Sequence, residues 1–187
     1  MDLHLMDAIL KGHVPAQGKV LDLGCGEGRN GIYFIQQQYD YHGLDQNESK
    51  IRLLEYLATS NEKTDKVSFS VGSMQEVHFG NDYDLIIASR ILHFVQDAAD
   101  FRSVWEKVRA SLKVGGLAYV AMNSAIASEF VVDQGDGIVE FMDGRKSCAL
   151  TDQMYADMKQ GMEEVEALQT IIYENQRCQS VLLLRKI

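Results

Sequence analysis

The sequence is poor in proline and cysteine, and neither residue type points to a specialised structural class. Pro15 is the single proline among 187 residues, and 46% of the residues are hydrophobic against 24% charged. This balance is typical of a globular domain and argues against long disordered stretches. Cys25, Cys148 and Cys178 are odd in number and lack the CxxC spacing of zinc sites. We therefore expect unpaired structural cysteines and no metal.

Long apolar runs and positive charge are also scarce. The longest apolar candidate, Leu85 to Val95, is interrupted by Arg90 and His93, and the N-terminal stretch contains Asp2 and Asp7 where a signal peptide is basic and then apolar. The 18 basic against 27 acidic residues give a net charge of −9. That sign opposes binding to a phosphate backbone or an anionic membrane. We expect a cytoplasmic protein whose partners include neither nucleic acid nor a membrane.

Short runs typical of β-strands recur along the chain, with helical patterns between most of them. Alternation of this kind predicts βαβ units and a parallel sheet that helices cover on both faces, which is an α/β fold. The strand-like runs are Lys19 to Leu23, Tyr39 to Leu44, Val67 to Val71, Tyr83 to Ala88 and Leu117 to Met122.

Two helices are predicted from apolar faces and capping residues. The first has the cap candidate Asn47, and the second has the cap candidate Asp97 and ends at Gly115-Gly116. Their apolar faces consist of Ile51, Leu54, Leu57 and Ala58, and of Phe101, Val104, Trp105, Val108 and Leu112.

The C-terminal part of the chain has a different pattern. Val165 to Tyr173 and Val181 to Ile187 are strand-like, and the gap between them is too short for a crossover helix, so the two strands must be antiparallel. Before them, Ser124 to Gly161 forms a long connection with a Gly/Asp-rich loop at Asp133 to Gly137 and a short helix beginning near Thr151. Long connections of this kind are often functional lids, and we expect this one to cover an acceptor pocket.

We interpret residues 1–187 as one domain. Residues 1–18 form an N-terminal helical cap with a helix from Leu3 to Leu10, and residues 124–161 form an insertion, or lid, before the C-terminal hairpin. No repeat or low-complexity linker divides the chain.

The most informative stretch is a strand that runs through three alternating glycines, Gly24, Gly26 and Gly28, into a helix. Glycines at such a turn let a ligand lie against bare main chain, and the helix N-terminus offers free N–H groups. The alternative is a tight strand-helix connection without a ligand. Gly26 to Gly31 also matches GxGxxG, the dinucleotide fingerprint, so the type of ligand is ambiguous on this motif alone.

Two acidic residues and the chain length favour a different ligand from a dinucleotide. Asp22, directly before the glycines, would repel a pyrophosphate but can hold an ammonium group. Asp45 closes the next strand, where a carboxylate can take both hydroxyls of a ribose, although it could instead cap the helix that starts near Glu48. A hydride-transfer enzyme would also need a substrate domain that 187 residues do not supply.

At this point the sequence resembles a known family. V-L-D-L-G-C-G-E-G-R-N is similar to motif I of the class I S-adenosylmethionine-dependent methyltransferases, and the resemblance covers about residues 18–187. The continuation from Gly26 to Tyr33, followed by Gly43 to Asp45, is similar to the small tellurite-resistance-type methyltransferases. The resemblance implies a Rossmann-like, seven-stranded, mostly parallel sheet with an antiparallel C-terminal strand and helices on both faces. It also implies S-adenosyl-L-methionine as cofactor and S-adenosyl-L-homocysteine as product.

The resemblance assigns roles to residues of the cofactor site. Asp22 and the loop backbone would hold the methionine end, Asp45 would chelate the ribose hydroxyls, and Gln46 would lie against the adenine. Ser73 and Met74 would meet the adenine edge, although many family members have Asp in place of Ser73, and the alternative for the pair is a loop residue beside a core residue. Cys25 is interpreted as an inert thiol rather than a reactive one. The full cofactor-binding set is Asp22, Gly24, Cys25, Gly26, Gly28, Arg29, Asn30, Asp45, Gln46, Ser73, Met74, Ser89 and Arg90.

The acceptor side is less defined by the sequence. His93 lies just past the fourth strand, at the edge where open α/β sheets bind ligands, and is the candidate base, the alternative being a histidine packed beside Phe94. Arg90 would orient an anionic acceptor or pair with a nearby carboxylate. Further residues that could select an acceptor are Tyr33, His4, Arg145 and Tyr155.

These observations lead to a hypothesis with two alternatives. We expect methyl transfer to a small-molecule acceptor by in-line displacement, catalysed by a monomer or a homodimer. The first alternative is a non-catalytic S-adenosylmethionine-binding or regulatory protein of the same fold. The second is a short nucleotide-binding oxidoreductase that uses Gly26 to Gly31 as its fingerprint.

Overall fold

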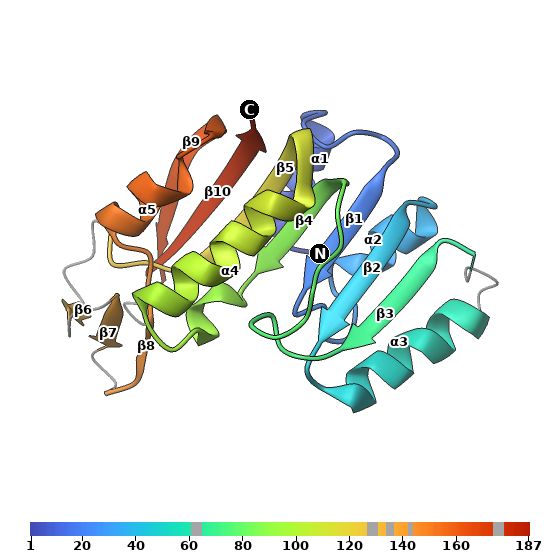
Figure 1. The fold of residues 1–187 in the computed structure, drawn as a ribbon, viewed down its shortest axis with the longest axis horizontal. Coiled ribbons are helices and arrows are strands. Elements are labelled where there is room, and N and C mark those ends of the chain that lie inside the picture. The colour runs from blue at the N-terminus through green and yellow to red at the C-terminus, as the bar shows by residue number, and fades with distance from the viewer. Residues whose placement is uncertain (61–64, 127–130, 134–136, 142–143, 174–177) are drawn as a thin grey trace.

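The computed structural model of the chain describes residues 1–60, 65–126, 131–133, 137–141, 144–173 and 178–187. Its centre is a seven-stranded sheet in the order β3-β2-β1-β4-β5-β10-β9, with helices packed against its two faces (Figure 1). The strands are β1 (Lys19–Leu23), β2 (Asp40–Asp45), β3 (Val67–Val71), β4 (Tyr83–Ser89), β5 (Leu112–Asn123), β9 (Met162–Ile172) and β10 (Cys178–Lys186).

Strand direction follows the prediction. The pairs among β3, β2, β1, β4 and β5 are parallel, whereas β10 is antiparallel to both β5 and β9. Asp22 of β1 pairs with Gly43 of β2 and with Ile87 of β4, so it lies in the middle of the sheet. The mostly parallel sheet and the antiparallel C-terminal strand, inferred from a gap too short for a crossover, are confirmed.

The helices bury separate groups of residues against the sheet. Leu5 of α1 (Leu3–Leu10) and Phe34 of α2 (Gly31–Gln36) share one core cluster with Val20, Leu85 and Tyr119. The opposite cluster contains side chains of α4 (Ala98–Ser111) and α5 (Asp152–Met158) together with alternate residues of the same strands. In α3 (Glu48–Ser60), Ile51 and Leu54 pack with Cys25. The buried alternation on β1 and β4 places apolar residues on both faces, as a covered parallel sheet requires.

The predicted caps are confirmed, but one predicted helix end is wrong. Asn47 Oδ1 accepts from the backbone N–H of Ser49 at 3.0 Å, and Asp97 Oδ1 accepts from that of Ala99 at 2.8 Å. The helix that begins after Asp97 ends at Ser111, not at Gly115-Gly116, and β5 begins immediately at Leu112. The two glycines instead lie within β5, where the register with β4 shifts between Tyr83 and Leu85. Glycine inside a strand marks such an irregularity as readily as it ends a helix.

The insertion contains a second sheet that the sequence did not predict. It is a three-stranded antiparallel sheet of β6 (Val131–Asp133), β7 (Ile138–Phe141) and β8 (Lys146–Cys148). The expected Gly/Asp-rich loop falls on it in part, and residues 134–136 of that loop lie outside the described residues. The predicted short helix is α5, whose cap Thr151 accepts at Oγ1 from the backbone N–H of Met154 at 3.2 Å. In Figure 1 the small sheet and α3 lie at opposite ends of the main sheet.

None of the helices in the described parts of the chain combines the length and the apolar character needed to cross a membrane.

Candidate active site

The order of the strands creates a switch point between β1 and β4. The chain passes from β1 to β2 on one side and returns to β4 on the other side of β1. The loops that follow β1 and β4 therefore diverge at the carboxyl edge of the sheet, which is where open α/β sheets bind ligands. The first of these loops contains the three alternating glycines, and the second follows Ser89 and contains Arg90 to His93.

Backbone hydrogen bonds fix the glycine loop against the end of β2. Cys25 N–H donates to the carbonyl of Leu44 at 3.0 Å, and Gly28 N–H donates to the carbonyl of Cys25 at 2.9 Å. Gly26 N–H donates to the Asp45 Oδ2 atom at 2.9 Å. The two sequence motifs, the glycine loop and Gly43 to Asp45, are therefore parts of one structure.

The three glycines share one constraint and differ in another. A Cβ at Gly24 would lie 2.6 Å from Cδ1 of Ile91, and a Cβ at Gly28 would lie 2.6 Å from Cδ2 of Leu54. A Cβ at Gly26 would meet nothing closer than the carbonyl oxygen of Gly24 at 3.9 Å, yet the residue has a φ of +57°. Gly24 and Gly28 also have a positive φ, of +65° and +82°, so the backbone conformation favours glycine at all three positions. Packing adds a second constraint at Gly24 and Gly28, whereas Gly26 presents bare backbone to open space. The open space at Gly26 fits a ligand that lies against the loop. A strand-helix turn without a ligand would not need this space to stay open.

Asp22 is a buried carboxyl group beside this loop. Tyr41 donates from its hydroxyl to Asp22 Oδ2 at 3.1 Å. Burial raises the pKa of Asp22 to about 7, and the nearby charge of Asp45 adds to this rise, while the Tyr41 hydrogen bond and Arg29 oppose it. A buried carboxylate without a full counter-charge is suited to a cationic ligand group.

Asp45 does not cap the following helix, because Asn47 does. Its Oδ1 atom accepts from the backbone N–H of Asn47 at 2.8 Å, and its Oδ2 atom accepts from Gly26. Each carboxylate oxygen has a second lone pair, so the group can still accept from a pair of hydroxyls. Gln46 beside it is exposed.

The residues after β3 are tied to the same edge. Gly72 N–H donates to the carbonyl of Asp45 at 3.0 Å, which brings the Ser73 turn next to β2. Met74 is buried, and its side chain belongs to the core cluster around α4. Ser73 is partly buried, and its carbonyl accepts from Val77 N–H at 3.0 Å. The Met74 side chain therefore packs in the core, and contact of this turn with the adenine stays a prediction.

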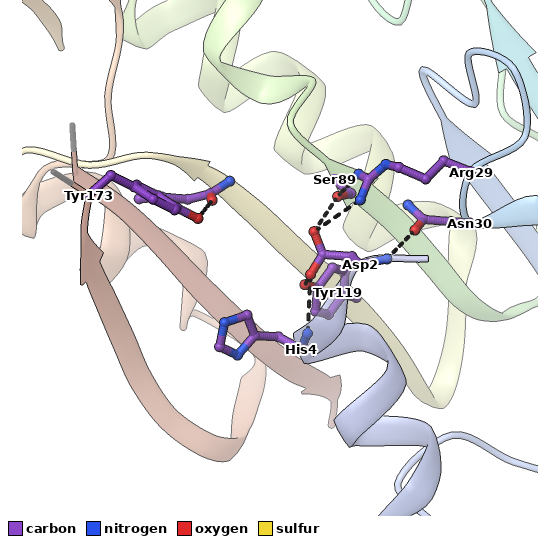
Figure 2. A network of polar contacts seen from close by, with 8 residues as sticks. Asp2, His4, Arg29, Asn30, Ser89, Tyr119 and Tyr173 are labelled. Atoms are coloured by element: carbon purple, nitrogen blue, oxygen red, sulfur yellow. Dashed lines mark hydrogen bonds and ion pairs between the residues drawn. The ribbon is translucent and has the colours of Figure 1, made fainter. Parts of the chain in front are cut away.

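A polar network around Asp2 joins three of the predicted site residues (Figure 2). Asn30 Oδ1 accepts from the backbone N–H of Asp2 at 2.9 Å. The Asp2 carboxylate accepts from Ser89 Oγ at 3.3 Å and lies 3.5 Å from Arg29 Nη1. Tyr119 of β5 donates from its hydroxyl to Asp2 Oδ1 at 2.6 Å. The side chains of Arg29, Asn30 and Ser89 are thus directed to the N-terminal segment, and their contact with a cofactor stays a prediction.

The sequence analysis did not assign Asp2 or Tyr119 to the site. The available signal was a polar residue before an apolar helix, and Asp2 does cap α1 by accepting from His4 N–H at 3.2 Å. Burial raises the pKa of Asp2, but the hydrogen bonds from Tyr119 and His4 and the charges of Arg29 and Arg90 outweigh burial and leave the pKa lowered. Asp2 is therefore an ionised anchor for the N-terminal segment at the switch point.

Arg90 and His93 follow β4 on the other side of the switch point. Arg90 has a φ of +62°, and its N–H donates to the carbonyl of Ala121 at 2.7 Å. His93 lies in the 3-10 turn η1 (Leu92–Phe94), and its ring packs against Phe94 with centroids 4.3 Å apart. Burial, with a contribution from Arg90, lowers the pKa of His93 to about 4. Its Nδ1 atom is buried without a hydrogen-bond partner in the described residues. The imidazole is neutral at pH 7 and is a weak base.

An open cleft of about 1180 Å³ adjoins Arg90 and His93. Its described lining residues come from Arg90, from η1 and the segment after it, from the ends of β5 and β10, from the position just after β9, and from the small sheet and its turn. They are Arg90, His93, Phe94, Val95, Gln96, Asn123, Ile138, Phe141, Arg145, Lys146, Ser147, Tyr173, Cys178 and Gln179. The small sheet thus lines a cleft next to the candidate site, and its role as a lid over an acceptor stays a prediction.

Of the four residues proposed to select an acceptor, Arg145 alone is among the described residues that line this cleft. The ring of His4 points away from the Asp2 carboxylate in Figure 2, and the residue borders a separate small cavity. Tyr33 packs edge-on against Phe34, and Tyr155 donates from its hydroxyl to Glu164. The sequence analysis missed Asn123, Tyr173 and Gln179 because they are far apart in the chain and belong to no motif.

The cysteines show no sign of chemical activation. Cys25, Cys148 and Cys178 are free and buried. Burial, with nearby acidic residues, raises the pKa of the Cys25 thiol well above its usual range and that of Cys148 to about 12. Over the described residues, no three His, Cys, Asp or Glu side chains gather as a metal site would require.

Comparison with known sequences identifies relatives of the chain. The profile of the family described as tellurite resistance protein TehB matches residues 5–134, which is more than half of the chain. The probable S-adenosyl-L-methionine-dependent methyltransferase TehB of Haemophilus influenzae is 30% identical over 98 residues, covering 52% of this chain and 33% of the relative. The chain therefore spans about a third of the length of this curated relative.

Solved structures share the fold. The crystal structure of TehB from Haemophilus influenzae superposes with a TM-score of 0.74 at 20% identity, covering 97% of this chain and 62% of the other. The 1,6-didemethyltoxoflavin-N1-methyltransferase of Burkholderia thailandensis, solved with 1,6-didemethyltoxoflavin and S-adenosylhomocysteine, superposes with a TM-score of 0.72 at 19% identity. That match covers 96% of this chain and 75% of the other. The fold is thus the Rossmann-like fold of the class I methyltransferases, and by its profile match the chain belongs to the TehB family.

Proposed function

We propose that the chain is an S-adenosyl-L-methionine-dependent methyltransferase that acts on a small-molecule acceptor. The observation that carries this proposal is the open backbone at Gly26, whose N–H donates to Asp45 and whose loop follows the strand that contains the buried Asp22. Membership of the TehB family and the name of the Haemophilus influenzae relative support the same activity.

Each group of residues at the loop matches one part of the proposed cofactor. Asp22 would hold the ammonium group of the methionine moiety, because a buried carboxylate gains most from a cationic partner. The Gly24 to Gly28 backbone would lie along the same moiety, and Asp45 would accept from the ribose hydroxyls. Gln46 and Ser73, exposed and partly buried beside Asp45, would border the adenine.

When bound, S-adenosyl-L-methionine supplies a methyl group on a sulfonium centre, open to in-line attack by a nucleophile. The residues of the chain have to align the acceptor with this group and exclude water. Arg90 joins the two halves of the site, because it directly follows Ser89 at the switch point and lines the cleft. His93 would remain neutral beside the acceptor and remove a proton only from an acidic group.

A small acceptor fits the cleft. The cleft volume of about 1180 Å³ lies just above the roughly 300–1,000 Å³ of most small-molecule sites, so it has room for a small organic acceptor. The Burkholderia thailandensis neighbour, a 1,6-didemethyltoxoflavin-N1-methyltransferase, binds the small molecule 1,6-didemethyltoxoflavin on a similar fold.

The experiment is a calorimetric titration of the protein with S-adenosylhomocysteine, with NADH as the control ligand. We expect binding of S-adenosylhomocysteine alone. The variant Asp45→Ala should weaken binding, whereas Asp40→Ala, at the exposed start of the same strand, should not. Preferential binding of NADH, or unchanged affinity in Asp45→Ala, would overturn the proposal.

A second candidate function is cofactor binding without catalysis. The lowered pKa of His93 favours it, because a weak base gives little help to an alcohol or ammonium acceptor. Binding of S-adenosylhomocysteine without methyl transfer to a broad acceptor panel would distinguish this candidate from the enzyme.

A further inference from the structure

The cleft beside η1 is cationic in a chain that is strongly anionic. Arg90, Arg145 and Lys146 line it, and its described lining contains no aspartate or glutamate. Lys146 is paired with Glu140, at 3.6 Å between Nζ and Oε2. The whole chain has a net charge of −9. Cations gathered in a low-dielectric recess concentrate ligands of the opposite charge. The charge of the cleft therefore favours an anionic ligand.

Arg90 is the cation best placed to meet such a ligand. It is exposed, and within the described residues its guanidinium forms no ion pair. The carboxylate of Asp2 acts on it electrostatically but is already bonded to Tyr119 and paired with Arg29. The φ of +62° at Arg90 is unfavourable for a residue with a side chain, and such strain concentrates at functional sites.

Aromatic side chains line the cleft together with these cations. Phe94 lies four residues after Arg90 and is 68% exposed, and Tyr173, which also lines the cleft, is 42% exposed. The Tyr173 hydroxyl donates to Gln179 Oε1 at 2.9 Å, the dashed line beside Tyr173 in Figure 2. An exposed phenyl ring and an oriented phenol ring offer faces for a planar apolar ligand. The space in the cleft is many times that needed by an inorganic oxyanion of a few atoms.

We propose that the methyl acceptor is an aromatic organic anion, bound with its ionised group at Arg90 and its ring against Phe94. This proposal rests on the methyltransferase function proposed above and names its substrate class. An ionised acceptor also suits a cleft without a strong base. As the nucleophilic atom bonds to the methyl carbon, the carbon–sulfur bond breaks and its electron pair returns to sulfur. The charges of anion and sulfonium cancel, and no proton has to be removed.

The test measures binding to protein that is saturated with S-adenosylhomocysteine. The probes are 1-naphthoate, its neutral analogue 1-naphthamide, and tellurite as an inorganic oxyanion. We expect 1-naphthoate to bind at least about tenfold more tightly than 1-naphthamide, because one charge-assisted contact contributes about 1.5–3 kcal/mol. Tellurite should not displace it.

Two variants and one control separate charge from shape. Arg90→Gln should weaken 1-naphthoate about tenfold and leave 1-naphthamide unchanged, whereas Phe94→Ala should weaken both. Arg102→Gln, an exposed arginine of α4 that does not line the cleft, should change neither. Thermal unfolding of each variant verifies that it folds.

Three results would overturn the proposal while the methyltransferase function stands: no binding of 1-naphthoate to protein that binds S-adenosylhomocysteine, equal affinity for acid and amide, or displacement of 1-naphthoate by tellurite. Failure of S-adenosylhomocysteine itself to bind would overturn both proposals.

Discussion

The candidate active site has two halves that are built in different ways. The cofactor half is the loop Gly24 to Gly28 with Asp22 and Asp45, and the acceptor half is the cleft beside η1. The cofactor half is a backbone structure, in which the N–H groups of Cys25 and Gly26 bond to the end of β2 and that of Gly28 bonds to the carbonyl of Cys25 within the loop. The acceptor half is a side-chain structure, lined by residues from η1, β5, the small sheet, β10 and the position just after β9. The first tolerates little change at its glycines, whereas the second can exchange lining residues without altering the sheet. This difference explains how one fold can keep a cofactor and change its acceptor.

The largest effect should come from Asp22, the buried charge of the cofactor half. The folded pKa of about 7 lies above the ordinary 3.8, so the folded protein binds the proton more tightly than the unfolded chain. Below pH 4, Asp22 is protonated in the folded protein and lowers the free energy of unfolding little compared with a neutral residue. This free energy falls as the pH rises from 4 through 7, because the unfolded chain ionises readily there whereas burial opposes ionisation of the folded group. The change from 3.8 to about 7 corresponds to roughly 4 kcal/mol.

We expect Asp22→Asn to unfold with a free energy close to that of the native protein at pH 4 and up to about 4 kcal/mol higher at pH 8. Denaturant unfolding at both pH values measures this difference. Asp40→Asn, exposed on β2, is the control. Parallel pH profiles for native protein and Asp22→Asn would show that the carboxyl group is not strained by burial.

The next effect tests whether Gly26 faces a ligand. Gly26→Ala should lower the affinity for S-adenosylhomocysteine about 100-fold, or about 2.7 kcal/mol, because a methyl group would occupy the open space beside the loop. Gly115→Ala is a matched control, since Gly115 has a φ of +80° with no atom within 4 Å of an added Cβ. It lies near the amino end of β5, away from the carboxyl ends of the strands where the glycine loop lies. Both variants should lose similar stability, and equal affinities in both would refute a ligand at Gly26.

A smaller effect is expected at Asp2, which joins the N-terminal segment to the switch point. Asp2→Asn should lower the free energy of unfolding by about 1–2 kcal/mol at pH 7, since it weakens a buried charged network. The lowered pKa of Asp2 makes this contribution present above pH 4 and lost as the pH falls through the folded pKa. Asp7→Asn, in an exposed ion pair of the same helix, should cost less than about 0.5 kcal/mol. Chemical denaturation at pH 7 compares the two, and equal losses would contradict a buried anchor.

The smallest effect is an expected lack of reaction. The three buried thiols, including Cys25 in the glycine loop, should not react with a disulfide reagent at pH 8 in the folded protein and should react once it is unfolded. Rapid labelling of the folded protein at Cys25 would show that the loop opens.

The cofactor half was predictable because its determinants are contiguous in the chain. Asp22 and the glycines fall within seven residues, and Asp45 closes the next strand, so parallel pairing alone brings them together. The strands were also predictable, since β1 and β3 have the expected bounds. The wrong helix end at Gly115-Gly116 has a physical origin: two glycines indicate a break in regular structure, and the break lay in a strand.

The acceptor half was not predictable for the opposite reason. His93 was placed correctly at the carboxyl edge, but its low pKa depends on burial by residues distant in sequence. The small sheet has short strands without a periodic pattern, so its sequence resembled a loop. The sequence showed Asp2 only as an acidic residue near the N-terminus, and its role in the network requires Tyr119, which lies 117 residues away.

The sequence by itself thus determined the α/β fold, the direction of the last strands and the position of the glycine loop, because these depend on local patterns and on the reach of short connections. The tertiary structure alone decided which glycine faces open space, how burial shifts the pKa values of Asp22 and His93 in opposite directions, and which cations line the cleft. These properties depend on what surrounds each group in three dimensions, since desolvation and charge act through space and not along the chain.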